Sequence, residues 1–419
     1  MPQIKTTLIE LNPWWKGEFE IEFKEREIYK KIQKFLTMPQ IIALTGLRRV
    51  GKTTIMYKIA KDFITNSFDP QKIIYFSFDE FSNIEIRDLL SNYEELIGKN
   101  LKEGGYLLLL DEVQKLNDWE NQIKATYDSF KGKVKIVVSG SESLFIRKRL
   151  KETLAGRIFE FKVDPLSFKE FLVFNNVEFK QLSLYEKELK KLFSEYMSTL
   201  GFPELVGITN KETIKKYLKE GIVEKVLYRD LPKIFEIRDT SVLESLLNVF
   251  MEDPGQIVEV SELAKELKVS RQTISIYLSY LESSFLIRKL YNFSRNRRKV
   301  ERKLKKYYPS IISVDLLFRE DDFSKSKVFE WLLVNQLNAE FFWRDPYKNE
   351  VDIVLAVDKI VPIEIKYGKI DTNGILAFMD KFNIKEGHIV SYEKEDKQKT
   401  NGKIVLITPA FKFLLSAEQ

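Results

Sequence analysis

The sequence predicts an α/β protein built on a doubly wound parallel sheet, and three observations support this fold class. Five short apolar runs rich in branched residues alternate with helical stretches over the first 165 residues. The runs are continuous, which is typical of strands buried on both faces. The stretches between them are long enough for the helical crossovers that parallel neighbours require. The expected strands are Ile41–Thr45, Ile73–Phe78, Tyr106–Leu110, Val134–Val138 and Ile158–Val163.

The length of 419 residues predicts several domains, because a single core rarely extends over so long a chain. We interpret residues 1–39 as an N-terminal arm and residues 40–165 as the sheet core. Residues 166–240 lack strand-like runs and are expected to form a helical lid. A further unit at 241–307 precedes a mixed α/β unit at 308–419.

The composition restricts the chemistry. The chain has no cysteine and one histidine, His388, which excludes disulfides and thiolate zinc sites and argues against a histidine-dependent triad. It has no apolar run of membrane-spanning length, and Met1–Glu10 lacks the apolar segment of a secretory signal. We therefore expect a cytoplasmic protein with no membrane partner, in which any metal is held by oxygen ligands.

A phosphate-binding loop follows the first expected strand. The segment from Gly46 to Thr53 fits the pattern G-x-x-x-x-G-K-[ST] and runs into a helical stretch. The glycines let backbone N–H groups face phosphate oxygens, Lys52 neutralises the β- and γ-phosphates, and the Thr53 hydroxyl ligates Mg²⁺. ATP and Mg²⁺ are the expected cofactors, and the binding residues are Gly46, Leu47, Arg48, Arg49, Val50, Gly51, Lys52, Thr53, Thr54 and Asp111.

The third expected strand ends in two carboxylates, Asp111 and Glu112. Carboxylates at the end of a buried strand are costly unless they bind something. We expect Asp111 to hold the magnesium shell and Glu112 to orient and deprotonate the attacking water, because phosphoryl transfer depends on positioning and charge neutralisation. A nucleotide switch that only binds would not need Glu112, so the pair favours hydrolysis.

Two further residues are candidates for the same chemistry. The fourth expected strand is followed by a serine-rich turn, from which Ser141 is expected to sense the γ-phosphate or the water; a plain polar strand terminus is the alternative. Arg157 is a candidate cation for the transition-state charge, in its own subunit or in a neighbour's site. The alternative for Arg157 is an ordinary surface arginine.

These motifs together resemble those of a known family, the AAA-type ATPases of archaea and bacteria whose C-terminal half is nuclease-like. The resemblance covers nearly the whole chain, and it implies a sheet of order 5-1-4-3-2 and ATPase activity. It also marks residues 12–15 as a family feature, which we interpret as a packed N-terminal arm. The matching segments are Leu47–Val50, Leu110–Gln114, Ser139–Ser141, Leu154–Arg157, Pro165–Phe168 and Tyr228–Asp230.

The unit at 241–307 has a helix-turn-helix pattern followed by a basic stretch. The stretch Arg288–Lys306 carries ten basic residues against one acid, although the chain as a whole carries only +6. We expect a winged helix that binds DNA. Its expected contacts are Arg271, Gln272, Thr273, Ser275, Arg295, Arg297, Arg298 and Lys299. The alternatives are a solvated charged hairpin and a surface that grips protein.

The last unit resembles the PD-(D/E)XK nucleases. Two strands, Glu350–Leu355 and Pro362–Lys366, are expected to adjoin, with Glu364 and Lys366 on one face. If the register brings Asp352 to that face, Asp352 and Glu364 are candidate Mg²⁺ ligands with Lys366 beside them, and Glu330 is a further candidate. The alternative is an ion-paired hairpin.

Three functional hypotheses follow. The leading one is an ATP-hydrolysing AAA-type ATPase that acts on or is bound to DNA. The second is a nucleotide-dependent switch or scaffold whose C-terminal half binds protein, and the third is an ATP-gated nuclease. Association between identical subunits is left open by all three.

Overall fold

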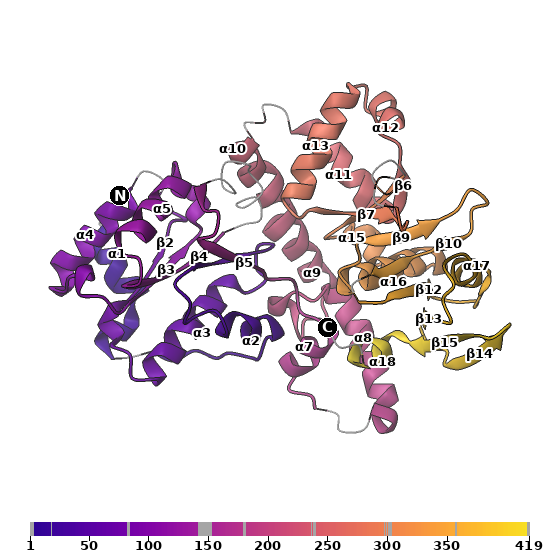
Figure 1. Cartoon of the computed structure of the whole chain (residues 1–419), viewed down its shortest axis with the longest axis horizontal. Helices are drawn as coiled ribbons and strands as arrows, with labels where there is room; N and C mark the ends of the chain where they lie inside the picture. Colours follow the sequence, from indigo (N-terminus) through magenta and orange to yellow (C-terminus); the bar gives the residue numbers. More distant parts are fainter. Residues whose placement is uncertain are drawn as a thin grey trace. The chain divides into compact units, whose positions relative to one another are not determined.

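A computed structural model of the chain shows two compact units, Met1–Leu166 and Ser167–Gln419, which are described separately (Figure 1). The structure describes residues 4–17, 19–81, 84–140, 153–178, 182–235, 237, 240–296, 298, 300, 304–356 and 358–416. None of the helices within these ranges is both long enough and apolar enough to cross a bilayer.

The first unit is built on a parallel sheet of five strands. Its order is β2-β3-β4-β1-β5, which is the order 5-1-4-3-2 implied by the family resemblance. Every strand begins at the residue predicted from its apolar run and ends within one residue of the prediction. The strands are β1 (Ile41–Thr45), β2 (Ile73–Ser77), β3 (Tyr106–Asp111), β4 (Val134–Ser139) and β5 (Ile158–Lys162).

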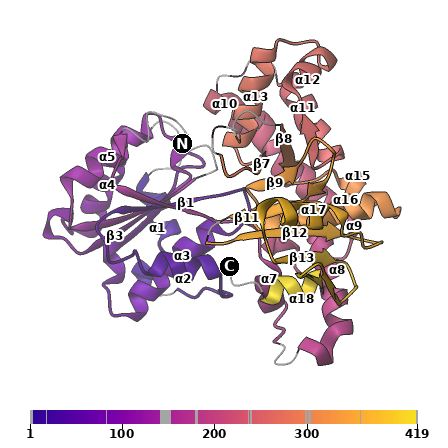
Figure 2. The same cartoon turned by 45° about the vertical axis from the view of Figure 1, so that its right-hand side comes forward.

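Helices cover both faces of this sheet (Figures 1 and 2). On one face, Leu8 of α1, Leu89 of α4 and Ile123 of α5 share a core with strand residues. On the other face, the Tyr57 ring of α3 lies 4.8 Å from the Tyr75 ring of β2. The helices are α1 (Ile4–Leu11), α2 (Glu27–Gln33), α3 (Lys52–Thr65), α4 (Ile86–Ile97) and α5 (Trp119–Ser129), with short turns η1 (Pro13–Lys16), η2 (Pro70–Lys72), η3 (Leu101–Glu103) and η4 (Val113–Lys115).

The N-terminal arm closes the edge strand β2 with side chains. The fully buried Asn12 amide donates to the carbonyl of Tyr75 and accepts from its N–H, at 2.8 and 2.7 Å. The indoles of Trp14 and Trp15 both donate to the carbonyl of Ile73. An edge strand presents unpaired backbone groups, and the arm pairs several of them. Residues 12–15 of the arm are thus packed against β2.

The second unit begins with the segment expected to be a lid. The regular elements that the structure describes in it are all helical, and they include two π-helical turns, η7 (Lys219–Val223) and η8 (Val226–Asp230). Because this segment belongs to the second unit, its role as a lid over the first unit stays a prediction. The other elements are α7 (Phe168–Phe174), η5 (Leu182–Tyr185), α8 (Glu186–Thr199), η6 (Pro203–Leu205), α9 (Lys211–Leu218) and α10 (Leu231–Phe235).

Among the described residues, the next elements are α11 (Ser241–Glu252), β6 (Gln256–Val258), α12 (Val260–Glu266), α13 (Arg271–Ser283), β7 (Ile287–Asn292) and β8 (Lys305–Pro309). The strands are antiparallel, with β8 between β6 and β7. The sheet continues through β9 (Phe341–Arg344) and β10 (Glu350–Val351), in the order β10-β9-β7-β8-β6. The predicted helix-turn-helix segment and the tail therefore share one sheet.

A second sheet of the tail has the order β11-β12-β13-β15-β14. Its helix α17 packs residues such as Phe378 against Trp343 of the sheet β10-β9-β7-β8-β6 and Ile389 of the second sheet. The strands are β11 (Ile353–Ala356), β12 (Ile360–Lys366), β13 (Glu386–Ser391), β14 (Asp396–Thr400) and β15 (Lys403–Pro409), and the helices are α15 (Val314–Leu317), α16 (Asp322–Gln336), α17 (Asn373–Phe382) and α18 (Ala410–Ser416).

The expected strand Glu350–Leu355 is divided at Asp352. Its first part, β10, pairs with β9, whereas its second part, β11, pairs antiparallel with β12. Asp352 therefore lies where the chain passes from one sheet to the other. The predicted pairing with the Pro362–Lys366 segment is confirmed, because Ile353 faces Ile363.

Candidate functional site

The loop after β1 is shaped to surround an anion. Gly46, Arg49 and Gly51 all have positive φ, at 138°, 64° and 98°. A Cβ on Gly46 would lie 2.1 Å from the carbonyl oxygen of Val163, so no larger residue fits there. Gly51 precedes α3 directly, so the loop leads into a helix N-terminus, where N–H groups and the helix dipole favour phosphate.

Lys52 lies inside this loop and is 6% exposed. Its Nζ donates to the carbonyl oxygens of Gly46 and Leu47, both at 2.9 Å. The ammonium group is thus held over the loop centre, where a phosphate oxygen would accept its protons. Arg26, which precedes α2, supports the loop from the arm: its guanidinium donates to the carbonyls of Val50 and Asp164, at 3.0 and 2.7 Å.

Asp111, at the end of β3, is the meeting point of three hydroxyl groups. Thr53 Oγ1 donates to its Oδ2 at 2.6 Å, and Tyr75 OH donates to the same oxygen at 2.9 Å. Ser139 Oγ, at the end of β4, donates to Oδ1. The pKa of Tyr75 is raised by burial and next by the charge of Asp111, so its hydroxyl keeps the proton that it donates. Thr53 and Asp111, the two residues expected to hold Mg²⁺, are therefore in direct contact.

Glu112 is held in a constrained position beside this aspartate. Its φ of 56° is uncommon for a non-glycine residue, and its N–H donates to Asp111 Oδ1 at 3.1 Å. Gln114 Nε2 donates to Glu112 Oε2 at 2.5 Å. Burial raises the pKa of Glu112, while the charge of Lys52 acts in the opposite direction. A carboxylate that is short of solvent and close to Lys52 is suited to accept a proton from water.

The donor set fits a magnesium nucleotide. Mg²⁺ prefers oxygen ligands and commonly binds through one or two protein groups together with substrate phosphates. Thr53 Oγ1 and Asp111 Oδ2, 2.6 Å apart, would hold that ion, and Lys52 would meet the β- and γ-phosphates. When bound, the ion would neutralise phosphate charge. Arg48 lies close enough to lower the pKa of Glu112 through its charge, so it is a further cation at this site.

Tyr75 and Ser139 were not singled out from the sequence, whereas Ser141 was. Ser141 lies outside the described residues. The register of β3 against β4 pairs Leu110 with Val138, so the next residues, Asp111 and Ser139, become neighbours at the same edge of the sheet. Because Ser139 directly follows the apolar run Val134–Val138, its contact with Asp111 could have been predicted from the sequence.

Arg157 lies near the amino-terminal ends of the strands, whereas the phosphate loop lies at their carboxyl-terminal ends. Its carbonyl accepts from the N–H of Ile41, the first residue of β1, whereas the loop follows Thr45, the last. Five strand residues separate the two edges by roughly 16 Å. Arg157 Nε is paired with Asp128 at 3.1 Å. Arg157 therefore lies away from the phosphate loop, and its action in its own subunit or in a neighbour's site stays a prediction.

Comparison with known proteins agrees with this geometry. Residues 38–172 match a family model described as an AAA domain. The first unit contains an AAA domain. Residues 190–310 and 326–411 match two models described as domains of unknown function, DUF8612 and DUF4143. The AAA domain accounts for the parallel sheet and its phosphate loop.

Similar whole chains include two uncharacterized proteins of Methanocaldococcus jannaschii. One is 29% identical over 93% of this chain and 86% of its own length, and the other is 26% identical over 94% and 88%. Among solved structures, AMPPCP-bound DnaA from Aquifex aeolicus is 16% identical, with a TM-score of 0.30 over 65% of this chain and 92% of that chain. Cdc6p from Pyrobaculum aerophilum is 10% identical, with a TM-score of 0.32 over 76% and 97%.

In the second unit, α13 presents part of its predicted DNA-contact set to a groove of about 570 Å³. Arg271, Ser275 and Ser279 line it from the helix, and Lys289 and Lys305 line it from β7 and β8. Gln272 is exposed on the same helix. The Thr273 N–H instead completes the helix cap by donating to Ser270 Oγ at 3.0 Å.

The basic stretch after β7 is partly engaged within the tail. Arg295 donates to the carbonyl of Phe382 at 2.7 Å, and its guanidinium lies 5.8 Å from the centre of that ring. Arg298 is exposed. Arg297 and Lys299 lie outside the described residues. Arg295 is therefore held against α17, which weakens its case as a DNA contact.

The charged residues predicted for the tail do come together. Glu364 pairs with Lys366 at 2.8 Å, and Asp352 Oδ2 accepts from the N–H of Ile365 at 2.8 Å. Burial raises the pKa of Asp352 well above its usual range, and the charges of Glu364 and Glu330 raise it further. Burial likewise raises the pKa of Glu364 to about 7, against the opposing effect of Lys366. These four residues form one buried charged cluster.

Lys306 was not anticipated in this cluster. Its Nζ lies 3.6 Å from Glu330, 3.9 Å from Asp352, and in contact with Glu350. Within the described ranges, no group of three or more His, Cys, Asp or Glu side chains is arranged to hold a metal ion. The structure therefore corrects the expected arrangement of Glu330, Asp352 and Glu364 around Mg²⁺, because an ammonium group lies among the carboxylates.

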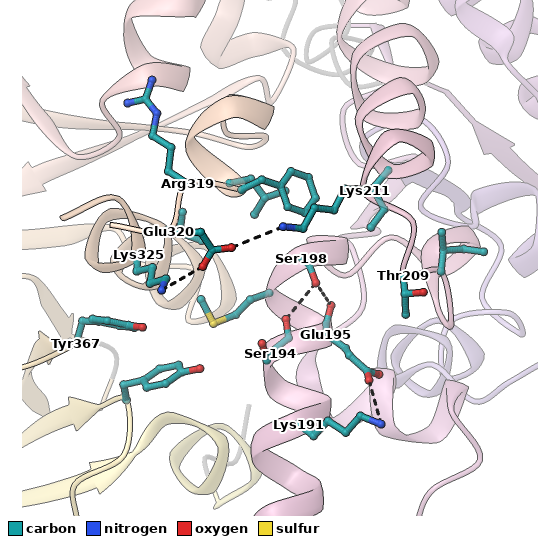
Figure 3. A pocket seen from close by; sticks show the side chains of 17 residues that line it. Lys191, Ser194, Glu195, Ser198, Thr209, Lys211, Arg319, Glu320, Lys325 and Tyr367 are labelled. Atoms are coloured by element: carbon teal, nitrogen blue, oxygen red, sulfur yellow. Dashed lines mark hydrogen bonds and ion pairs between the residues drawn. The ribbon is translucent and has the colours of Figure 1, made fainter. Parts of the chain in front are cut away.

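A pocket of about 390 Å³ lies between the helical segment and the tail (Figure 3). Its lysines are held by carboxylates: Lys211 and Lys325 share Glu320, at 3.6 and 3.4 Å, and Lys191 pairs with Glu195 at 3.9 Å. Of these pairs, Lys211–Glu320 links α9 to the start of the tail, whereas Lys191 and Glu195 both lie on α8. An apolar contact also joins the two segments, because the Phe193 ring of α8 lies 6.3 Å from the Phe329 ring of α16.

Proposed function

We propose that the chain is an ATP-hydrolysing AAA-type ATPase that acts on or is bound to DNA through the second unit. The observation that carries the hydrolytic part is the convergence of Thr53, Asp111 and Glu112 beside a loop that holds Lys52. Lys52 would bind the phosphates, Thr53 and Asp111 would hold Mg²⁺, and Glu112 would take a proton from the attacking water. Because positioning and charge neutralisation dominate phosphoryl transfer, this set is sufficient for slow turnover.

The DNA part rests on the order and pairing of α11 to β8. Three helices and an antiparallel sheet in which β8 lies between β6 and β7 support a winged helix. Gln272 and Arg271 are exposed at the start of α13, where a recognition helix meets base edges. The groove beside them adds Lys305, which suits a phosphate contact, and Lys289, which is paired with Glu282 at 2.7 Å.

The protein-binding alternative is kept because of one exposed apolar residue. Ile276 on α13 is 39% exposed, close to the predicted DNA-contact residues. An aliphatic side chain on that face suits a protein partner as well as a thymine methyl group. The ATP-gated nuclease is not proposed, because Lys306 lies where a metal ion would have to meet the carboxylates.

The test is ATP turnover by the purified full chain, with and without single-stranded, duplex and branched DNA, at several salt concentrations. The proposal predicts that DNA stimulates turnover and that DNA binding weakens steeply as salt rises. Arg271→Ala with Gln272→Ala should remove the stimulation, while Ile276→Ser should preserve it. If DNA neither binds nor changes turnover, the DNA part is overturned and the protein-binding alternative replaces it.

A further inference from the structure

The buried cluster of the tail contains almost as many cations as carboxylates. Glu330 on α16, Glu350 on β10, Asp352 and Glu364 supply the negative charges. Lys306 on β8 and Lys366 on β12 supply two positive charges, and Arg344 adds a third, 3.5 Å from Glu350. A divalent ion placed among these groups would add two positive charges beside the buried ammonium group of Lys306, which is costly.

Lys306 occupies the centre of this arrangement. Its side chain is 6% exposed, and its Nζ approaches three carboxylates that come from two separate elements and from the junction between the two sheets. The Phe342 ring lies 5.5 Å from the ammonium group and covers it further. Tyr308, two residues along β8 and so on the same face, donates its hydroxyl to Glu330 at 2.6 Å. Two residues of β8 therefore interact with the carboxylates, Lys306 through ion pairs and Tyr308 through a hydrogen bond.

We propose that Lys306 is the resident cation of the tail, so that the native chain holds its carboxylate cluster together without a divalent metal ion. A strand of the shared sheet thus supplies the charge that Mg²⁺ would supply in a metal-dependent nuclease. The cluster is a structural element that joins β8, α16 and the two sheets. This inference does not depend on the proposed ATPase activity.

This geometry predicts how removal of the Lys306 ammonium group should change metal binding. Glu364 Oε2 is buried and, within the described residues, has no hydrogen-bond partner. In a Lys306→Met variant, Glu350 Oε1, Glu330 Oε1 and Asp352 Oδ1 lose the ammonium group that lies among them. Three carboxylate oxygens in one pocket are a ligand set that Mn²⁺ and Mg²⁺ accept. Without the ammonium group, Glu350, Glu330 and Asp352 can close on the vacated space, so we expect the variant to gain a divalent ion site that their present arrangement does not offer.

The experiment measures Mn²⁺ binding to the nucleotide-free full chain by electron paramagnetic resonance of the free ion. The wild-type chain and the Asp352→Asn variant should bind Mn²⁺ equally, because Asp352 is not a metal ligand in the wild-type chain. Lys306→Met should bind one Mn²⁺ ion more than the wild-type chain does, with a Kd at least tenfold lower than that of the wild-type chain. The double variant Lys306→Met with Asp352→Asn should lack this additional site. Lys359→Met, which removes an exposed lysine of the tail, is the control and should bind Mn²⁺ as the wild-type chain does.

Two results would overturn the proposal. One is Mn²⁺ binding by the wild-type chain that Asp352→Asn abolishes; this comparison needs no Lys306 variant and holds even if Lys306→Met fails to fold. The other is a folded Lys306→Met chain that gains no Mn²⁺ site. ATP turnover of the same preparations reports separately on the AAA domain, so failure of either proposal is distinguishable from failure of the other.

Discussion

At the scale of single residues, the candidate site depends on how Asp111 is held. Its two oxygens accept from hydroxyl groups on three different elements, α3, β2 and β4. The carboxylate therefore has little freedom to rotate away from the phosphate loop. Thr53 also serves as an expected ligand, whereas Tyr75 acts on the site only through Asp111. Tyr75 is thus a positioning residue whose contribution can be separated from binding.

Removal of the Tyr75 hydroxyl tests this role. Tyr75→Phe keeps the ring and its packing on Tyr57 but loses the hydrogen bond to Asp111. We expect kcat for ATP to fall roughly tenfold, about 1.4 kcal/mol, with little change in KM, because the phosphates are bound by other groups. Tyr106→Phe is the control, since that hydroxyl donates to the carbonyl of Asn100 on the other side of the sheet. Equal loss in both variants would contradict the assignment.

The raised pKa of Glu364 makes a prediction about stability and pH. A carboxyl whose pKa is raised by folding stabilises the protein fully below its unfolded pKa of about 4.5 and loses that contribution as pH rises through about 7. Glu364→Gln mimics the protonated acid. It should match wild type near pH 4 and exceed it at pH 8 by up to roughly 3 kcal/mol, measured by urea unfolding. A variant less stable than wild type at pH 8 would contradict this.

At the scale of elements, the arm and the edge strand β2 form one structure. Asn12 reproduces with a side chain the two hydrogen bonds that a neighbouring strand would make to Tyr75. Since Tyr75 also touches Asp111, the arm supports the element that positions the site. The arm can pair with β2 because β2 is an edge strand, so one side of its backbone has no neighbouring strand in the sheet.

Replacement of Asn12 should therefore destabilise the AAA domain. Asn12→Ala leaves the N–H and the carbonyl of Tyr75 buried without these partners, which should cost about 2–4 kcal/mol of unfolding free energy. Chemical denaturation followed by tryptophan fluorescence would measure it, because Trp14 and Trp15 lie in the arm. Asn121→Ala, on the exposed surface of α5, is the control and should change stability by less than about 0.5 kcal/mol. Similar values for the two variants would argue against the edge-capping role.

Elements were more predictable than contacts between them. The five strands of the first unit could be located because strands buried on both faces have continuous apolar sequences, such as Tyr106–Leu110. The position of Arg157 was also predictable in principle, since a residue that precedes a parallel strand lies at the edge opposite the phosphate loop. Tyr75 and Lys306 could not be found in this way, because their contacts depend on which distant strands become neighbours.

At the scale of the whole molecule, the two units carry different parts of the proposed function. The AAA domain holds the nucleotide chemistry. The second unit holds the predicted DNA surface on α13, β7 and β8, and the sheet that contains β7 and β8 continues into the tail. The tail resembled a nuclease in sequence because its carboxylates and Lys366 have the right spacing. The structure adds Lys306 from a distant strand, which no spacing within the tail could reveal.

The central claim is that Lys52, Thr53 and the Asp111–Glu112 pair form one site that hydrolyses ATP. Phosphate release and nucleotide binding by wild-type, Lys52→Ala and Glu112→Gln chains test it most directly. The claim predicts that wild type releases phosphate, that Lys52→Ala loses turnover, and that Glu112→Gln binds ATP without hydrolysing it. Wild-type protein that neither retains nor splits ATP, or a Lys52→Ala variant as active as wild type, would contradict it.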